Sequence, residues 1–133
     1  MLLALSLLLA TSACSKYLEV RVFNATEISI RVCSLGDDTD CIRPAPNFGA
    51  ANMSWKRGVF TVETSGCKRS YNVPGIDALD DYRVSRNDPL QVVVAPDYSV
   101  YLLRKGGNPT ATRSERQPEG FPVEPSISGQ ACR

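Results

Sequence analysis

Two segments of the chain alternate apolar and polar residues with the period of two that indicates half-buried strands, and a third segment contains apolar runs. In the first segment, 17–33, the alternation gathers these apolar side chains on one face: Leu18, Val20, Val22, Ile28, Ile30 and Val32. A three-residue loop in the middle pairs Val22 with Ile28 across two strands. The same register sets Glu19 opposite Arg31, and both pairings are favourable. The pattern therefore predicts a β-hairpin.

The second segment, 55–73, turns at Ser65-Gly66. A two-residue turn there gathers these side chains on one face: Phe60, Val62, Cys67, Tyr71 and Val73. The same turn sets Glu63 opposite Lys68, so that opposite charges face each other. Arg69 falls on the apolar face, and we expect it to reach an edge of the sheet over an aromatic ring.

The third segment, 90–104, has two apolar runs joined at Pro96-Asp97. Both faces are apolar, which predicts a central place in a sheet. Between the second and third segments, 77–82 is expected to hold at most one short helix. Together the three hairpins predict a mainly β fold, either a small antiparallel β-sandwich or an open barrel.

The length of 133 residues is enough for one domain. From residue 106 onward the composition changes, because four of the nine prolines lie there and large apolar residues are few. We therefore expect a β-domain over 14–105 and a Pro/Gly-rich tail over 106–133. The tail is expected to be extended or mobile, except where Phe121 and Cys132 hold it.

The first residues have the pattern of an export signal. An uncharged, mostly apolar run over residues 2–10 is too short to cross a bilayer, which takes about 20 residues in a helix. Such a run followed by small residues is typical of a signal peptide, here residues 1–13. No Lys or Arg precedes the run, so we expect the true translation start to lie upstream of Met1.

The segment Ala10-Thr11-Ser12-Ala13-Cys14 resembles the lipobox of bacterial lipoprotein precursors. The resemblance implies that Cys14 receives a thioether-linked diacylglycerol and an N-acyl chain such as palmitate. It implies attachment to a membrane through this lipid, since two or more acyl chains anchor a protein stably. The resemblance also implies a sorting rule, by which an Asp directly after the cysteine favours retention in the inner membrane, and this chain has Ser15 there. We therefore expect the outer membrane, with the protein facing the periplasm.

The chain has five cysteines: Cys14, Cys33, Cys41, Cys67 and Cys132. With Cys14 attached to lipid, four remain for disulfides in a compartment where such bonds persist. Four cysteines allow three connectivities, and the sequence alone does not choose between them. We favour Cys33–Cys41 with Cys67–Cys132, because the first pair closes a short polar loop. No cysteine spacing is typical of zinc, and no metal is expected.

Charge and composition exclude several function classes. Fifteen Lys and Arg against 14 Asp and Glu give no basic footprint for nucleic acid. The chain has no histidine, which excludes Ser-His-Asp, Cys-His and His-ligated zinc mechanisms within it. The Ser65–Lys68 stretch matches the S-x-x-K motif of penicillin-recognising enzymes, but inside a tight hairpin it is best explained by chance.

Two groups of aspartates lack the spacing of a calcium loop, and we interpret them as solvated: Asp37, Asp38 and Asp40, and Asp77, Asp80 and Asp81. No cofactor is expected. A basic, aromatic-edged patch that contacts anionic lipid, glycans or an acidic partner is a further hypothesis. Its residues are Trp55-Lys56-Arg57, Lys68-Arg69, Arg83 and Arg86. Ordinary solvated strand faces remain the favoured interpretation.

These observations favour a non-enzymatic lipoprotein of the cell envelope. Its β-domain is expected to bind another envelope protein or to help an assembly hold its shape. The alternative is an inhibitor or immunity-type protein that inserts the Cys33–Cys41 loop into the cleft of a lytic enzyme. A hydrolase that uses carboxylates and tyrosine is the least favoured class, because no carboxylate pair has a spacing that supports it.

Overall fold

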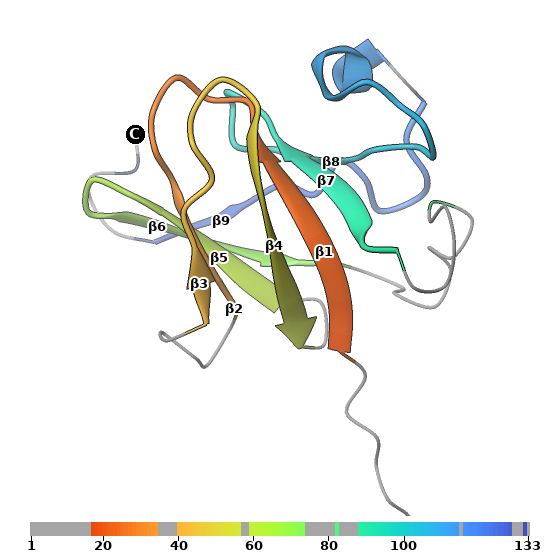
Figure 1. The fold of residues 1–133 in the computed structure, drawn as a ribbon. Helices are drawn as coiled ribbons and strands as arrows, with labels where there is room; N and C mark the ends of the chain where they lie inside the picture. Colours follow the sequence, from red (N-terminus) through yellow and green to blue (C-terminus); the bar gives the residue numbers. More distant parts are fainter. Residues whose placement is uncertain are drawn as a thin grey trace, which may run out of the picture.

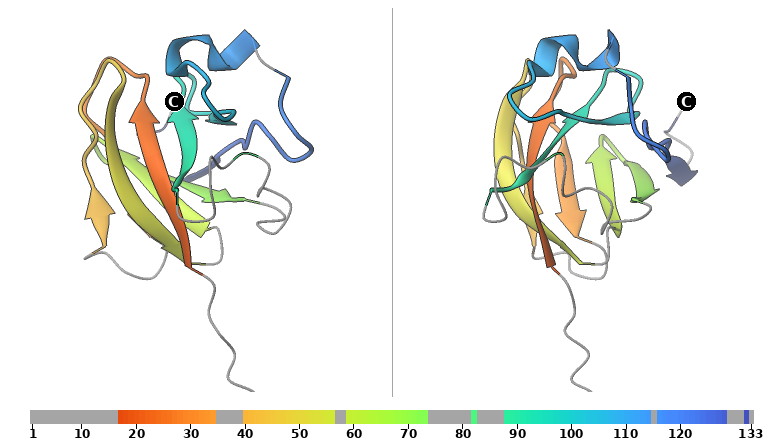
Figure 2. Two further views of the ribbon diagram at one scale, coloured as in Figure 1. Left: turned by 45° about the vertical axis from the view of Figure 1, so that its right-hand side comes forward. Right: turned by 90° about the vertical axis from the view of Figure 1, so that its right-hand side faces the viewer.

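The computed structural model describes residues 17–34, 40–56, 59–73, 82, 88–114, 116–128 and 132, and within these residues nine strands form two stacked sheets. The strands are β1 (Tyr17–Asn24), β2 (Arg31–Ser34), β3 (Cys41–Ile42), β4 (Gly49–Lys56), β5 (Val59–Thr64), β6 (Cys67–Asn72), β7 (Leu90–Val94), β8 (Val100–Leu102) and β9 (Ser126–Ser128). The first sheet has the order β4-β1-β7-β8, and the second has the order β3-β2-β5-β6-β9 (Figure 1). Figure 2 shows the two layers nearly edge-on in its right-hand view.

The predicted fold class, a mainly β protein in the form of a small sandwich, is confirmed. The first sheet is mixed, however, because β1 and β7 run parallel from Val20 opposite Leu90 to Asn24 opposite Val94. The reason is topological. β7 begins at the same end of the sandwich as β1, so that the two strands run in the same direction where they pair.

The core lies between the sheets, where alternate side chains of each strand point inward. Its members include Val20, Val22, Ile30, Val32, Phe60, Val62, Leu90, Val92, Val94, Val100 and Leu102. Trp55 stacks on Phe60 with ring centroids 4.0 Å apart, and Phe60 stacks on Tyr71 at 4.7 Å. Trp55 was expected to begin the hairpin that contains Phe60, and this is wrong. It belongs to β4 of the first sheet, so that its ring meets Phe60 across the core.

The segment from Tyr17 to Cys33 does not form the predicted hairpin, because β1 and β2 lie in different sheets. Glu19 lies opposite Ser54 of β4, and the Ser54 hydroxyl donates a hydrogen bond to its carboxylate. Arg31 lies opposite Glu63 of β5 rather than opposite Glu19. The inward-facing set is nevertheless correct at four positions: Val20, Val22, Ile30 and Val32.

A buried asparagine explains why the chain crosses between the sheets. The side-chain amide of Asn24 donates hydrogen bonds to the carbonyls of Ile28 at 2.8 Å and Pro44 at 3.1 Å. Its Oδ1 accepts hydrogen bonds from the Thr26 N–H at 3.0 Å and the Thr26 hydroxyl at 2.7 Å. These bonds satisfy backbone groups that a hairpin ladder otherwise satisfies. Ile28 therefore lies on the surface, 47% exposed, and the predicted pairing with Val22 is wrong.

The hairpin of β5 and β6 forms in the predicted register. Ser65-Gly66 makes the turn, and Glu63 lies opposite Lys68. Both turn residues have positive φ, 25° and 80°, as the favoured two-residue hairpin turn requires. Arg69 is buried on the apolar face, and its guanidinium carbon lies 3.7 Å from the centroid of the Tyr98 ring. The expected contact with an aromatic ring is therefore confirmed, whereas β6 lies between β5 and β9 rather than at an edge of the sheet.

The third hairpin also forms, with Val94 opposite Val100 on either side of the Pro96-Asp97 turn. β7 has the predicted interior place between β1 and β8. β8 does not, because it is the last strand of its sheet, although Val100 also forms a bridge with Val123. The short helix expected around 77–82 lies outside the described residues, apart from Tyr82.

The C-terminal segment packs on the sandwich, which differs from the expectation of an extended tail. A 3-10 helix, η2 (Pro109–Ser114), follows β8, and β9 pairs with β6. The Gln117 side chain donates a hydrogen bond to the Leu102 carbonyl at 3.0 Å and accepts one from its N–H at 2.8 Å. A side chain thus satisfies backbone groups of β8, which composition alone does not reveal. Phe121 is buried and holds the segment as expected.

The cysteines pair in the favoured connectivity. Cys33 is bonded to Cys41 with Cα atoms 4.1 Å apart, and Cys67 is bonded to Cys132 with Cα atoms 5.0 Å apart. The first bond joins β2 to β3, and the second joins the start of β6 to the C-terminal end of the chain. Cys14 lies outside the described residues. Among the described residues, no helix has both the length and the apolar character needed to cross a membrane.

Candidate binding site

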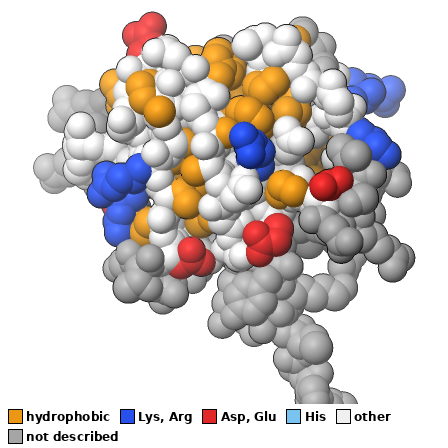
Figure 3. Space-filling view, viewed as in Figure 1, with side chains coloured by type: hydrophobic (Ala, Val, Ile, Leu, Met, Phe, Trp, Pro, Cys, Tyr) orange, Lys and Arg blue, Asp and Glu red, His pale blue; other side chains and the backbone are white. Residues whose placement is uncertain are grey.

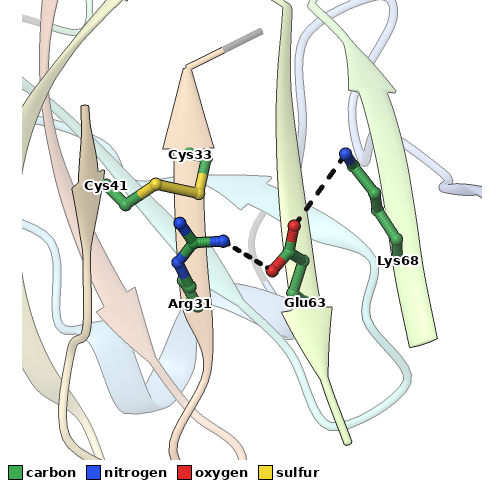
Figure 4. The surroundings of a disulfide bond; sticks show 5 residues. All are labelled: Arg31, Cys33, Cys41, Glu63 and Lys68. Atoms are coloured by element: carbon green, nitrogen blue, oxygen red, sulfur yellow. Dashed lines mark hydrogen bonds and ion pairs between the residues drawn. A yellow bond between two sulfur atoms is a disulfide. The ribbon is translucent and has the colours of Figure 1, made fainter. Parts of the chain in front are cut away.

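A hollow of about 320 Å³ opens beside the turn of the β5–β6 hairpin. Its lining residues are Arg31, Arg43, Glu63, Thr64, Ser65, Gly66, Cys67 and Lys68. Three of them are cationic and one is acidic, which leaves a net charge of +2. Figure 4 shows how β2, β5 and β6 carry Arg31, Glu63 and Lys68 side by side, close to the Cys33–Cys41 disulfide.

Glu63 lies between two of the cations. Its Oε2 atom is 2.8 Å from Nη1 of Arg31, and its Oε1 atom is 3.9 Å from Nζ of Lys68. The side chains of Arg31 and Glu63 are 27% and 28% exposed, so that water screens the pair only in part. Such pairs add little to stability, but they orient the side chains. Among the described lining residues, the cations therefore outnumber the carboxylates.

Arg43 enters the hollow from the connection between β3 and β4. The side chain is exposed, whereas Pro44 next to it is buried. The Pro44 carbonyl accepts the 3.1 Å hydrogen bond from the Asn24 side chain. This bond fixes the backbone beside Arg43, while the guanidinium remains in contact with solvent.

The arrangement is suited to binding a carboxylate, phosphate or sulfate group. Arginine offers a planar fork of N–H donors to such oxygens, and lysine adds a point charge. The hydroxyls of Thr64 and Ser65 line the same hollow and add neutral donors. Ser65 and Lys68, the S-x-x-K match, lie on a hairpin turn, whereas that motif acts on a helix.

Strand β6, which carries Lys68 of this hollow, also carries two buried side chains, Arg69 and Tyr71. Nη1 of Arg69 donates a hydrogen bond to the hydroxyl of Thr64, which lines the hollow, at 3.1 Å. The Tyr71 hydroxyl donates a hydrogen bond to the Tyr98 carbonyl at 2.6 Å. Burial raises the pKa of Tyr71 well above its ordinary value of 10.0, and the nearby Arg69 opposes the shift only in part. Tyr71 therefore stays protonated at physiological pH.

The basic patch that the sequence suggested does not form from the described residues. Trp55 is fully buried in the core, so it cannot edge a surface patch. Lys68 points outward and Arg69 inward, because neighbouring residues of a strand face opposite sides. The remaining members lie outside the described residues or have undescribed side chains: Lys56, Arg57, Arg83 and Arg86.

Sequence reasoning missed Arg43 and the grouping of Arg31 with Glu63. That grouping depends on pairing β2 with β5, whereas the alternation had paired β2 with β1. The opposition of Glu63 and Lys68 was the one signal that pointed to this region, and it is confirmed. Arg43 had no signal, since it lies in an irregular connection.

The aspartate groups offer no site among the described residues. Asp40 is exposed, and the other aspartates named above lie outside the described part of the chain. Within that part, no cluster of three or more His, Cys, Asp or Glu side chains is placed to hold a metal ion. The loop from 35 to 39 is also outside it, so that loop insertion into an enzyme cleft stays a prediction.

None of the known protein families, curated proteins or solved structures compared with this chain matches it.

Proposed function

We propose that this protein is a non-enzymatic lipoprotein of the bacterial cell envelope, whose β-sandwich binds an anionic group on another envelope protein. The lipobox-like segment that ends at Cys14 supports the lipid anchor. The hollow lined by Arg31, Arg43 and Lys68 supports the binding role. The expected location is the outer membrane, with the sandwich facing the periplasm.

The position of the hollow relative to the start of β1 carries this proposal. β1 begins at Tyr17, three residues after Cys14. Three residues reach at most roughly 10 Å, so an anchor at Cys14 holds the sandwich close to the bilayer by this end. Asn24 is the last residue of β1, and its side chain bonds to Pro44, next to Arg43. The hollow therefore lies toward the opposite end of the strand.

This distance decides which anionic partner the hollow meets. The eight residues of β1 span about 25 Å at the rise of a β-strand. Charges in physiological salt are screened beyond about 8 Å. With the anchor at Cys14, we expect the hollow to lie beyond the field of its own lipid head groups and to face the aqueous compartment. An acidic segment of an envelope protein is then the expected ligand.

Metabolic labelling with an alkyne analogue of palmitate tests the anchor. The wild-type protein should carry label and fractionate with membranes. Cys14→Ser should lose the label and either accumulate uncleaved or be released in soluble form. Cys41→Ser is the matched control, because it removes a cysteine and leaves the lipobox intact. A Cys14→Ser protein that stays membrane-bound with unchanged mass and processing contradicts the proposal.

Cross-linking in intact envelopes tests the binding role. Arg43→Glu reverses one charge at the hollow and should abolish the cross-linked species formed by the wild-type protein. Lys105→Glu makes the same charge change at an exposed residue outside the hollow, and it should leave that species intact. A cross-linked species that survives Arg43→Glu contradicts binding at this site.

A further inference from the structure

Two large hydrophobic side chains stand out on the surface of the described residues. Ile28 is 47% exposed and Phe48 is 38% exposed, whereas the other large hydrophobic side chains that the structure describes are buried or half-buried. Ile28 lies in the connection between β1 and β2, and Phe48 lies in the connection between β3 and β4. Both connections lie at the upper end of Figure 1, away from the start of β1.

Asn24 holds these two connections together. The Phe48 N–H donates a hydrogen bond of 2.6 Å to the Asn24 carbonyl, and the Asn47 N–H donates one of 3.0 Å to the Thr26 carbonyl. The Asn24 side chain also bonds the Ile28 carbonyl at 2.8 Å. One buried residue thus fixes the backbone of both exposed side chains. In Figure 3, hydrophobic side chains gather on the upper and central part of this face, and Lys and Arg side chains lie at its left, near its centre and at its right.

Phe48 is held in a backbone conformation that suits glycine. Asn47 and Phe48 have φ of 57° and 68°, and two consecutive positive φ values are the requirement of a type I′ turn. Asn-Gly is the favoured pair in such a turn, because a Cβ atom destabilises the left-handed region. Gly49 follows directly, where an added Cβ would lie 2.5 Å from the Ala45 carbonyl oxygen. Glycine is therefore present at position 49, where a Cβ atom would clash, whereas phenylalanine occupies position 48, where the positive φ favours glycine.

Backbone strain and an exposed ring at the same residue are both unfavourable for the isolated fold. Strained residues of this kind concentrate where a protein binds something. Aromatic side chains, phenylalanine among them, are also enriched at protein interfaces. Phe48 therefore has the features of a binding residue rather than of a folding residue.

The charges around the two side chains indicate what they bind. Arg43 lies in the same connection as Phe48, and its hollow carries a net positive charge. Glu27, next to Ile28, is exposed and disfavours insertion of this turn into an anionic bilayer. We propose that Ile28 and Phe48 are the apolar anchors of a docking surface for a protein segment that combines large apolar residues with carboxylates, which pair with Arg43. The inference rests on the proposed binding role and names the class of partner.

Peptide display tests this proposal. The full chain, tagged after Arg133 and immobilised, is panned against random 12-residue peptides, and the enriched peptide is synthesised with a fluorophore. Its sequence should combine Asp or Glu with Phe, Leu, Trp or Met. Its affinity should fall about tenfold or more for Phe48→Gly, as expected for an interface anchor. Tyr101→Ala, which removes a half-buried aromatic ring from β8, is the matched control and should leave affinity unchanged.

Two further measurements separate the possible failures. Phe48→Gly should resist unfolding better than Phe48→Ala, since only glycine takes this φ without strain. The reverse order overturns the strain argument. In the second measurement, vesicles of phosphatidylcholine and phosphatidylglycerol are passed over the immobilised wild-type protein and over the immobilised Phe48→Gly variant. Binding that depends on Phe48 overturns the protein partner in favour of a membrane.

The peptide itself distinguishes this inference from the proposed function. Weaker binding to Arg43→Ala with unchanged binding to Phe48→Gly leaves the charged hollow as the site and overturns the apolar anchors. Weaker binding to Phe48→Gly with unchanged binding to Arg43→Ala supports the anchors and overturns the role of the carboxylates, and with it the proposed use of the hollow. Weaker binding to both variants supports the whole surface.

Discussion

The turn at Ser65-Gly66 and the connection at 25–30 join strands with the same alternation of apolar and polar residues, yet they lead to different places. The first returns the chain into the same sheet, and the second carries it into the opposite sheet. At Ser65-Gly66 the requirement is local, because two consecutive residues take positive φ and one of them is glycine. Nothing lies within 4 Å of the position that a Cβ of Gly66 would take.

The connection at 25–30 is decided by a residue outside itself. Asn24 binds the Pro44 carbonyl, 20 residues further along the chain, and the same amide binds Ile28. Alternation therefore tells which face of a strand is buried, and turn chemistry tells which strand it pairs with. Where the turn chemistry is local, the sequence reveals the pairing. Where it depends on a distant carbonyl, the sequence does not.

The largest expected effect on the free energy of unfolding comes from removing a disulfide. One disulfide lies next to the Ser65-Gly66 turn, and the other lies close to the connection at 25–30. Cys132→Ser opens the bond at the hairpin, which joins residues 65 apart, and Cys41→Ser opens the bond beside the connection, which joins residues 8 apart. Loop-closure entropy predicts a loss of about 4.4 kcal/mol for Cys132→Ser and about 2.6 kcal/mol for Cys41→Ser. Urea unfolding of the oxidised proteins measures both losses. A larger loss for Cys41→Ser contradicts the entropic ranking.

The next effect is at Asn24 itself. Asn24→Ala removes the side-chain donor to the Pro44 carbonyl and the side-chain acceptor of the Thr26 N–H, and both of these hydrogen bonds are buried. Each buried polar group left unsatisfied costs about 1–3 kcal/mol, so the free energy of unfolding should fall by about 3 kcal/mol or more. Asn52→Ala changes an exposed asparagine on β4 and should cost about 0.5 kcal/mol or less. Equal losses for the two variants would show that Asn24 does not direct the crossing.

The features that the sequence predicts correctly are those set by local turn chemistry, and the features that it misses depend on distant residues. The β5–β6 register and the contact of Arg69 with an aromatic ring follow from short-range pattern and a two-residue turn. The disulfide pairing was favoured among three possibilities, because Cys33 and Cys41 close a short polar loop. Strand β4 was missed over most of its length, because Gly49–Met53 shows no alternation of large apolar residues. The packing of the C-terminal segment was missed because the Gln117 amide, a polar group, holds it to β8.

The candidate site was harder to predict than the fold. The Glu63–Lys68 pair belongs to one hairpin, and the sequence revealed it. Arg31 joins that pair only because the chain crosses between the sheets before β2, and no local pattern indicates this crossing. Arg43 depends on the same event through Pro44 and Asn24. The site was missed for the same reason that the first hairpin was predicted wrongly.

A smaller effect tests the local turn. Gly66→Ala meets no atom within 4 Å, so that its only cost is the left-handed backbone at φ 80°. The expected loss is about 1–2 kcal/mol. Gly106→Ala is the matched control, since Gly106 has φ 69°, also has nothing within 4 Å and lies outside the hairpin. Thermal unfolding should give similar losses of stability for Gly66→Ala and Gly106→Ala. If Gly66→Ala instead loses as much stability as Asn24→Ala, the distinction between a local turn and a connection that depends on distant residues is wrong.

The smallest effect is a dependence on pH within the hairpin. Tyr71→Phe removes the hydroxyl that donates to the Tyr98 carbonyl and should cost about 1 kcal/mol at neutral pH. In the wild-type protein, burial raises the pKa of Tyr71 above its ordinary value of 10.0. The unfolded chain therefore loses the Tyr71 proton first as the pH rises. Above pH 10 the wild-type protein loses stability from this group, by up to about 1.4 kcal/mol per pH unit.

Tyr71→Phe has no such proton to lose, and this isolates the effect from the other groups that titrate at alkaline pH. The difference in stability between the two proteins should be constant below about pH 9 and shrink as the pH rises above 10, with a reversal of sign if the folded state survives far enough. Urea unfolding of both proteins at a series of pH values between 7 and 11 measures this difference. A difference that stays constant through pH 11 contradicts the burial of the Tyr71 hydroxyl. The Tyr71 end of the Trp55–Phe60–Tyr71 stack would then be open to water.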